Sequence, residues 1–593
     1  NTILKRKSKI IKNSILFMKI IRINLESNKI NYEEIARDSK YFLLGGRGLT
    51  SQIVHDEVPP NCDPLGPQNK LIIANGILAG SPFPNSARTS IGAKSPLTNG
   101  IKEANVGGRP AMMLARYGIR AIVLENQSPN LKIISIQENQ IKVLPAEEYK
   151  GLGNYELHNK LKNKHGNNIG IYSIGPAGEF MMRAASVAAN DLEGYPSRHA
   201  ARGGLGAVMG SKNIKAIVII PPKSSQIKIL DIKKFREVSK PFAQNLANTK
   251  QTFSTFGTAL MMRPMNEYGG IPTKNFHMGS FDKIENITGE KLHEIVTARG
   301  GKKRLACIPT CVIKCSNLVL DEHGKHITSS LEYETMALNG TNLLIDDLDS
   351  LAKIDHLCDD VGMDTIEFGG TVGVAMDCGK VDWGNAKRVF EILDAEIRKN
   401  THEGQLYGNG VKIIGETLKA KRIPEIKGQG ISAYDSRVFK AMGVTYATSP
   451  MGADHTSGAA IAGRVASQHK DYGELTENKG KFDLSFELQV YTAVLDSMGC
   501  CYFIGPSYEN MEIIANAINA MYNLNLTRDD IIKIGIEIIR TELEFNKKAG
   551  ITTEMNDIPN FFREIPSEPT GLKYTFAKDD LKAFWKRLDD HSF

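Results

Sequence analysis

The sequence predicts an α+β fold in which a β-rich N-terminal domain is followed by two mainly α-helical domains. Short runs rich in Val and Ile, of strand length, follow one another through the first third of the chain. After a Pro-Pro-Lys-Ser-Ser linker at 221–225, apolar residues recur at helical spacing instead. Strands grouped before helices favour α+β over an alternating α/β arrangement. A chain of 593 residues also needs more than one core.

The first predicted domain, residues 18–222, contains the strands. The apolar runs are bounded by Gly, Pro and Asn, which end strands in turns. Glycine is dense at 45–48, 107–108 and 203–206, where the backbone must turn tightly or approach a ligand closely. The predicted strands lie within 19–26, 70–78, 121–126, 131–137, 169–175 and 214–222.

The remaining sequence predicts two helical domains, 223–430 and 431–593. Helical periodicity is clearest in three segments, which are 346–361, 385–399 and 529–548. Residues 1–17 differ from both regions, because they carry five Lys or Arg residues and no acid. We expect them to be a loose basic tail, or an extension upstream of a chain that begins at Met18.

Composition narrows the functional class. Hydrophobic residues make up 41% and charged residues 24%, as in soluble globular proteins, and no apolar run approaches the roughly 18 residues of a membrane span. The net charge is +8, of which the tail supplies five, so the rest gives little support for nucleic-acid binding. A local basic patch could still receive an acidic electron carrier. The eight cysteines are sparse and clustered, which indicates a reducing, cytoplasmic location and metal binding rather than disulfides.

Three of these cysteines, Cys307, Cys311 and Cys315, lie within the stretch CIPTCVIKC. A distant fourth thiol is available at Cys500 or Cys501. Three clustered thiolates and a remote one are typical of a [4Fe–4S] cluster, whereas structural zinc sites more often use two close pairs. The alternative is three small buried residues without chemical function. The pattern favours a redox protein.

A motif occurs twice in the helical region. Residues 359–364 and 496–501 both read D-x-x-G followed, one residue later, by Asp or Cys, and both end a helical stretch. The glycine allows a turn, and the leading Asp359 or Asp496 can accept hydrogen bonds from a ligand's amino groups. Each motif alone is most simply a helix end. The pair would suit a ligand with two similar halves.

Together these features resemble the tungsten-dependent aldehyde:ferredoxin oxidoreductase family, from Met18 to the C-terminus. The resemblance rests on the cysteine loop, on both D-x-x-G motifs, and on several stretches that occur in the same order. These stretches are GGRGL (45–49), DPLGPQNKLIIANGILAG (63–80), ARTSIGAKSPLTNG (87–100), EANVGG (103–108), YSIGPAGE (172–179), ARGGLGAVMGSKN (201–213) and EYET (332–335).

The resemblance implies cofactors and the residues that would hold them. Cys307, Cys311, Cys315 and Cys501 would ligate one [4Fe–4S] cluster, with Cys501 preferred because it ends the second motif. A bis-pyranopterin tungsten (or molybdenum) cofactor and a magnesium ion that bridges its phosphates are also implied. The cofactor residues would be Asp359 with Asp364 of the first motif, Asp496 of the second, Arg88 between cluster and pterin, and the backbone carbonyls of Asn105 and His199 for magnesium.

The resemblance also implies a reaction. Glu334 and His455 match an acid–base pair beside the metal, although from sequence alone each could be an ordinary surface or loop residue. The pair would convert a small aldehyde and water to a carboxylate. Electrons would leave through the cluster to ferredoxin or a ferredoxin-like subunit.

Two departures from the family pattern bear on partners. The first cysteine gap is C-x3-C rather than C-x2-C, which suggests a branch that works with its own ferredoxin-like subunit. Lys353 stands where some members have the glutamate of an E-x-x-H iron ligand motif that ends here at His356. Any homodimer is therefore expected to lack an interfacial iron.

Two other readings compete with aldehyde oxidation. One is a reductase on the same scaffold, acting on a carboxylic acid or an aromatic thioester. The other is a non-catalytic electron-transfer subunit that retains only the cluster. Arg88, Asn105, Asp359 and Asp496 together argue against the second, because a bare cluster needs none of them.

Overall fold

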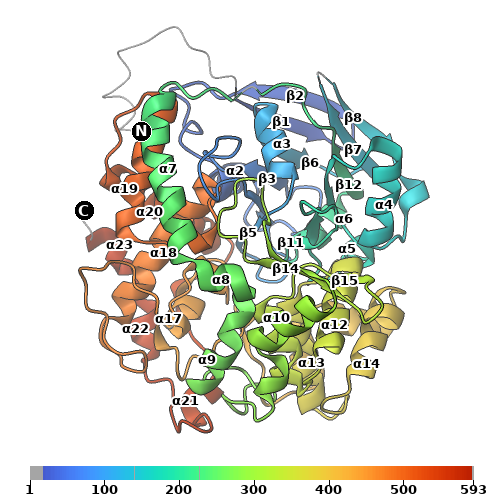
Figure 1. Ribbon diagram of the computed structural model, residues 1–593, viewed down its shortest axis with the longest axis vertical. Coiled ribbons are helices and arrows are strands. Elements are labelled where there is room, and N and C mark those ends of the chain that lie inside the picture. The colour runs from blue at the N-terminus through green and yellow to red at the C-terminus, as the bar shows by residue number, and fades with distance from the viewer. Residues whose placement is uncertain (1–17, 139, 226, 462, 591–593) are drawn as a thin grey trace.

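The computed structural model describes residues 18–138, 140–225, 227–461 and 463–590, so the predicted basic tail at 1–17 lies outside the described residues. Two six-stranded mixed sheets form the N-terminal part, and helices form most of the rest (Figure 1). The predicted α+β fold is confirmed. Within the described residues, no helix combines the length and apolarity that crossing a membrane would need.

The first sheet has the strand order β2-β1-β6-β3-β4-β5. Strand β1 pairs parallel with β6, while the neighbouring pairs β3–β6, β3–β4 and β4–β5 are antiparallel. The strands are β1 Lys19–Asn24, β2 Lys29–Glu34, β3 Leu71–Asn75, β4 Thr89–Lys94, β5 Ile101–Val106 and β6 Ile119–Glu125.

The second sheet has the order β11-β10-β9-β12-β7-β8. In this sheet, strands β7 and β12 pair in parallel, and the other neighbouring strands pair antiparallel. The strands are β7 Lys132–Gln137, β8 Gln140–Pro145, β9 Gly170–Ser173, β10 Val187–Ala189, β11 Arg198–Ala200 and β12 Ile214–Ile219. The longer helices among these strands are α2 Gly46–Glu57, α3 Pro110–Arg116, α4 Asn154–His165 and α6 Leu205–Ser211.

All six apolar runs contain strands, but the sequence analysis did not identify β2, β4, β5, β8, β10 and β11. Strands β4 (TSIGAK) and β5 (IKEANV) carry Ser, Lys, Glu and Asn, yet they are almost wholly buried. Hydrophobic periodicity cannot find a strand whose buried side chains are polar. These two strands line the candidate site described below.

Helices from the C-terminal half cover the first sheet. Helix α2 packs on β3, β4 and β5 on one side and on α18 (Lys481–Met498) and α20 (Arg528–Lys548) on the other (Figure 1). Helix α19 (Tyr508–Tyr522) packs between α7 (Ile232–Thr249) and α20. The last part of the chain therefore reaches back to the N-terminal sheet.

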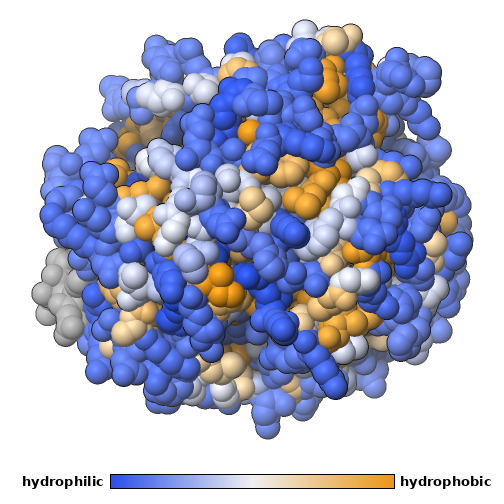
Figure 2. Space-filling model, turned by 90° about the horizontal axis from the view of Figure 1, so that it is seen from below, coloured by the Kyte–Doolittle hydropathy of each residue, from blue (hydrophilic) through white to orange (hydrophobic). Residues whose placement is uncertain are grey.

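The middle of the chain forms a second helical group at the far end of the molecule (Figure 1). It includes α10 Gly289–Ala298, α11 Tyr333–Asn339, α12 Leu348–Val361, α13 Thr365–Asp377, α14 Ala386–Glu391, α15 His402–Gly408 and α16 Val411–Thr417. The surface turned toward the viewer in Figure 2 is mostly hydrophilic, with hydrophobic groups in separate patches.

Two smaller features complete this region. A three-stranded sheet consists of β13 Lys302–Leu305, β14 Ser316–Leu320 and β15 His326–Thr328, and the cysteine loop joins its first two strands. The helix predicted over 385–399 instead changes after α14 to a π-helical turn, Ile392–Ile397. Arg398 N–H donates to Leu393 O there, a five-residue spacing that an uninterrupted α-helix does not contain.

Candidate active site

The second D-x-x-G-x-C motif is fixed against the N-terminal domain. Its first three residues are the last of α18, and Gly499 ends the helix with a φ of 74°. Ile77 N–H donates to Ser497 O at 3.2 Å, and Arg88 N–H donates to Gly499 O at 3.1 Å. A Cβ on Gly76 would lie 2.0 Å from Gly499 N, so this approach requires glycine. Backbone contacts thus join segments more than 400 residues apart.

Asn85 joins the cysteine loop to the same motif. Its backbone N–H donates to Thr310 O at 2.9 Å, and its Oδ1 accepts from Val312 N–H at 3.1 Å. Its carbonyl accepts from Cys501 N–H at 2.8 Å. One asparagine, with a positive φ of 57°, therefore positions the loop cysteines relative to Cys501.

The four predicted cluster cysteines are brought together and buried. Cys311 hydrogen-bonds to Cys307, which lowers the pKa of the Cys307 thiol to about 6 although burial opposes the shift. Burial raises the pKa of Cys315, and the charges of Glu332, Cys307 and Cys501 raise it further, so Cys501 lies near the loop thiols. Cys500 instead packs in the main apolar core.

This donor set fits an iron–sulfur cluster. The loop cysteines pack with Ala87, Ile308 and Ile313, while Arg88 and Arg198 both favour the ionised form of Cys307. No group of three or more His, Cys, Asp or Glu side chains in the described part of the chain is arranged to hold a single metal ion. Four buried thiols with positive charge nearby suit a multi-iron cluster, whose ligands are spread around several metals.

Arg88 and Asn105 lie side by side near Asp496. Arg88 Nε donates to Asn105 Oδ1, and Arg88 Nη2 donates to the Asn105 carbonyl at 3.3 Å. The carbonyl predicted to bind magnesium thus already accepts a hydrogen bond, although it retains a second lone pair. Asn105 Nδ2 and Glu103 Oε1 are buried without hydrogen-bond partners. These unpaired polar atoms from β5 indicate a place for a polar ligand.

Asp496 belongs to a buried charge network. Burial raises its pKa to about 6, and the positive charges of Arg47 and Arg88 partly oppose that shift. Arg47 Nη1 is 3.5 Å from Asp496 Oδ2, and Arg47 also forms a two-bonded pair with Glu542 at 2.9 and 2.8 Å. Asp496 is therefore held by Arg47 within a network of buried charges.

Asp359 of the first motif contacts His199. The distance between Asp359 Oδ1 and His199 Nε2 is 3.0 Å, and Asp359 Oδ2 is buried without a hydrogen-bond partner. His199 Nδ1 lies 2.7 Å from Ser186 Oγ. The family resemblance implies a role only for the backbone carbonyl of His199. In the structure, the His199 side chain also contacts Asp359, which is itself a predicted cofactor residue.

Asp364 is satisfied by protein groups. Its Oδ1 caps α13 by accepting from Ile366 N–H at 3.0 Å, and its Oδ2 accepts from Arg202 Nε at 3.3 Å. To hold a cofactor as well, Asp364 would have to use carboxylate oxygens that already accept these two hydrogen bonds. Its clearest structural role is to connect α13 with Arg202.

Glu334 and His455 face each other in a partly buried site. Glu334 Oε1 is 3.4 Å from His455 Nε2 and has no hydrogen-bond partner, and Glu334 Oε2 accepts from Ala433 N–H at 2.9 Å. Burial raises the pKa of Glu334, while His455 opposes the shift. A carboxyl group with one free oxygen beside an imidazole can exchange a proton with a ligand.

Sequence reasoning missed several buried charged residues around this site. Arg202 contacts Asp364, and Lys102 pairs with Asp454, the neighbour of His455. Although burial raises the pKa of Asp454, the charges of Lys102 and Arg202 hold it well below its usual range. The sequence signal that could have identified such residues is a charged residue inside a glycine-rich or apolar stretch, such as Arg202 in ARGGLG.

Comparisons with known proteins agree with this architecture. The family model for the aldehyde ferredoxin oxidoreductase N-terminal domain matches residues 20–221, and the model for domains 2 and 3 matches 235–588. The tungsten-containing aldehyde ferredoxin oxidoreductase of Pyrococcus furiosus is 32% identical over 595 residues, covering 96% of this chain and 95% of that protein. The protein of the same description from Thermococcus kodakarensis is 32% identical over 604 residues, with the same shares covered.

More distant relatives carry other names. An aliphatic sulfonate oxidoreductase, WOR-like subunit, of Pyrococcus furiosus is 26% identical over 615 residues, covering 95% of this chain and 92% of that protein. A chain in the active site complex BamBC of benzoyl coenzyme A reductase has a TM-score of 0.81 at 18% identity, covering 96% and 94%, which shows a shared fold. The two family matches and the 32% identical relatives span nearly the whole sequence. The chain therefore belongs to the aldehyde ferredoxin oxidoreductase family and is an oxidoreductase.

Proposed function

We propose that this protein oxidises an aldehyde and water to a carboxylate and passes the electrons through a [4Fe–4S] cluster to ferredoxin or a ferredoxin-like protein. The observation that carries the proposal is the partly buried Glu334–His455 pair, 3.4 Å apart. The names of the 32% identical relatives support the substrate class and the use of tungsten. Four buried cysteines support the cluster.

A bis-pyranopterin tungsten or molybdenum group would be held by Asp359 and Asp496. Each lies at the end of a helix and is largely buried, and the unpaired Asp359 Oδ2 could accept from a pterin amino group. Arg88 would lie between this group and the cluster. A magnesium ion at the carbonyls of Asn105 and His199 is a further prediction from the resemblance, with phosphate oxygens completing its ligands.

The chain's own residues would manage the protons. Glu334, held by Ala433 N–H, would remove a proton from water as it adds to the carbonyl carbon. His455 Nε2 would donate to the carbonyl oxygen as negative charge develops. When bound, the metal–pterin group would accept the two electrons released as the hydrated carbon gives up its C–H hydrogen and its hydroxyl protons and becomes a carboxylate. The His455 and Glu334 side chains are only 17% and 14% exposed, and the protein that surrounds most of the pair strengthens both interactions.

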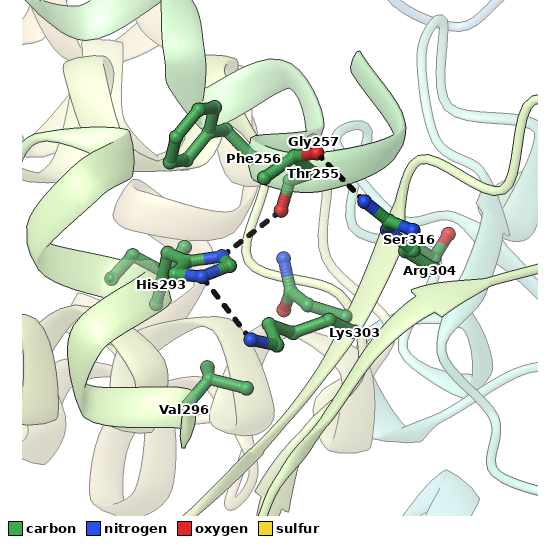
Figure 3. Close-up of a pocket in the computed structure, with 10 residues that line it drawn as sticks. Thr255, Phe256, Gly257, His293, Val296, Lys303, Arg304 and Ser316 are labelled. Carbon is green, nitrogen blue, oxygen red and sulfur yellow. Dashed lines mark hydrogen bonds between the residues drawn. The ribbon is translucent and has the colours of Figure 1, made fainter. Parts of the chain in front are cut away.

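The surface beside the cysteine loop supports an acidic electron acceptor. Residues 295–320 contain no Asp or Glu. Lys303 Nζ donates to His293 Nε2 at 3.1 Å, and Arg304 donates to Thr255 Oγ1 at 3.3 Å (Figure 3). In the described structure, neither cation has a carboxylate within 4.0 Å. Unneutralised cations next to a redox centre would attract an acidic protein.

Other charged groups extend this basic surface. Lys314 lies in the cysteine loop itself, and Lys250 lies near both Cys501 and Arg464. Arg464 stacks over the ring of Tyr502 rather than pairing with a carboxylate. We therefore propose the surface that carries these cations, beside the cysteine loop, as the docking face of the acceptor.

A reductase on this scaffold is the second candidate. The structural similarity to the BamBC chain supports a shared fold only, at 18% identity. Loss of Glu334 or His455 from the site would favour reduction, yet both are present and face each other. The buried polar surroundings of Asp359 and Asp496 count against a cluster-only subunit, which would not need them.

Dye-linked assays test the proposal. Anaerobically purified protein is supplied with a series of aliphatic and aromatic aldehydes and a viologen dye, and the carboxylate product is quantified against reduced dye. Aldehyde oxidation with two electrons per carboxylate would support the proposal. Protein loaded with tungsten or molybdenum that oxidises none of them, yet reduces thioesters with a low-potential donor, would favour the reductase.

A further inference from the structure

Arg202 joins three segments around the candidate site. It is buried and donates from Nη1 to Ser432 Oγ at 3.1 Å and to Ala453 O at 2.7 Å. Its Nε donates to Asp364 Oδ2 at 3.3 Å. The guanidinium group thus ties the first D-x-x-G-x-D motif to the two loops that flank the acid–base pair.

Ser432 transmits this arrangement to His455. Ser432 Oγ lies 3.1 Å from His455 Nδ1. An arginine only donates hydrogen bonds, so Ser432 Oγ must be the acceptor in its contact with Arg202. The serine's own hydrogen is then available for His455 Nδ1, which accepts it only when that nitrogen is unprotonated. With the serine donating to Nδ1, the hydrogen of the neutral imidazole resides on Nε2.

The other side of the imidazole favours the same tautomer. His455 Nε2 is directed at Glu334 Oε1 across 3.4 Å. A protonated Nε2 places a positive partial charge toward the carboxylate, whereas the opposite tautomer would turn a lone pair toward it. The neighbours on opposite sides of the ring, Ser432 and Glu334, are therefore both compatible with the Nε2–H tautomer, and Glu334 favours it.

We propose that Arg202 and Ser432 are positioning residues that hold His455 as the Nε2–H tautomer, so that it presents a hydrogen-bond donor to the substrate oxygen. The inference rests on the proposed function for the substrate. The position of the proton on His455 does not depend on which substrate the enzyme uses. Neither residue touches the reacting atoms in this arrangement, because both act through the far side of the ring.

A double-mutant cycle tests the kinetic consequence in the loaded enzyme. Ser432→Ala should lower kcat for dye-linked aldehyde oxidation about tenfold, the effect of one lost hydrogen bond, with KM for the aldehyde little changed. Ser432→Thr retains the hydroxyl and should recover most of the loss. In a His455→Gln background, whose amide donor has no tautomers, Ser432→Ala should have no further effect. Equal losses in both backgrounds would overturn the proposal.

A spectroscopic measurement tests the proton position directly. Nitrogen NMR of the oxidised holoenzyme labelled with 15N-histidine is compared with that of His455→Gln to assign the His455 signals. We expect an unprotonated Nδ1 and a protonated Nε2. A protonated Nδ1 in the wild-type protein would overturn the inference, whatever the substrate. Wild-type enzyme that oxidises no aldehyde would refute the proposed function, while the NMR result would still decide the tautomer.

Discussion

Glu334 Oε1 lies 3.4 Å from His455 Nε2, although the two residues come from different predicted helical domains. Glu334 stands in the first turn of α11, and His455 begins a short 3₁₀ turn, His455–Ser457. The pair is therefore created by tertiary packing. Its chemistry depends on how firmly the two elements are held together.

The first prediction concerns the base. Glu334→Gln retains the shape of the side chain but cannot take up a proton, so kcat should fall by about 100-fold or more. Iron and tungsten contents should stay at wild-type values, because no cluster cysteine is changed. Glu425→Gln, which alters a carboxylate that accepts from Gly428 N–H, is the control and should leave turnover intact. Full activity of Glu334→Gln would show that another group is the base.

The pH dependence follows from the environment of Glu334. Burial raises its pKa and His455 opposes the shift, with the net result above the ordinary value for glutamate. Only the ionised form can act as a base, so kcat/KM should rise with pH through this raised pKa. A profile of kcat/KM against pH checks the prediction. An acidic limb at or below the ordinary glutamate value would contradict it.

Neighbouring cysteines provide a matched test of cluster ligation. Cys501→Ala should lower iron content and abolish the cluster's visible absorption, because a thiolate ligand is lost. Cys500→Ala removes an adjacent thiol that packs in the apolar core, so iron should remain while the protein loses a modest amount of stability. Iron analysis and unfolding midpoints distinguish the two effects. Loss of iron in Cys500→Ala alone would reverse the assignment.

The basic surface predicts a dependence on charge. The double variant Lys303→Glu and Arg304→Glu should lower kcat/KM for an acidic two-[4Fe–4S] ferredoxin about tenfold at low ionic strength, relative to the viologen rate of the same protein. The difference should shrink as salt screens the charges. The double variant Lys533→Glu and Lys547→Glu, on the exposed side of α20, makes the same change of net charge and is the control. Equal effects of the two variants would exclude this surface as the docking face.

The sequence predicted the grouping of the cysteines but could not predict what positions them. CIPTCVIKC identifies three ligands by spacing, and the D-x-x-G-x-C motif favoured Cys501 through the family resemblance. Asn85, which joins both segments, follows a proline in an ordinary turn sequence and gives no signal by itself. Its role depends on backbone contacts between distant segments.

The polar interior was the least predictable part. Glu103 and Asn105 lie in a strand that is buried even though its residues are polar, so neither burial nor strand could be recognised from periodicity. Arg202 was visible only as one residue of a glycine-rich stretch. Its partners Asp364, Ser432 and Ala453 lie 162 to 251 residues away, a spacing that local patterns do not encode.

Metal analysis of anaerobically purified protein, from cells supplied with both tungsten and molybdenum, tests the central claim most directly. A bis-pyranopterin site with one cluster predicts about one tungsten or molybdenum and about four iron atoms per chain. Iron at that level without tungsten or molybdenum would contradict the account, because the Glu334–His455 pair would then have no electron acceptor beside it.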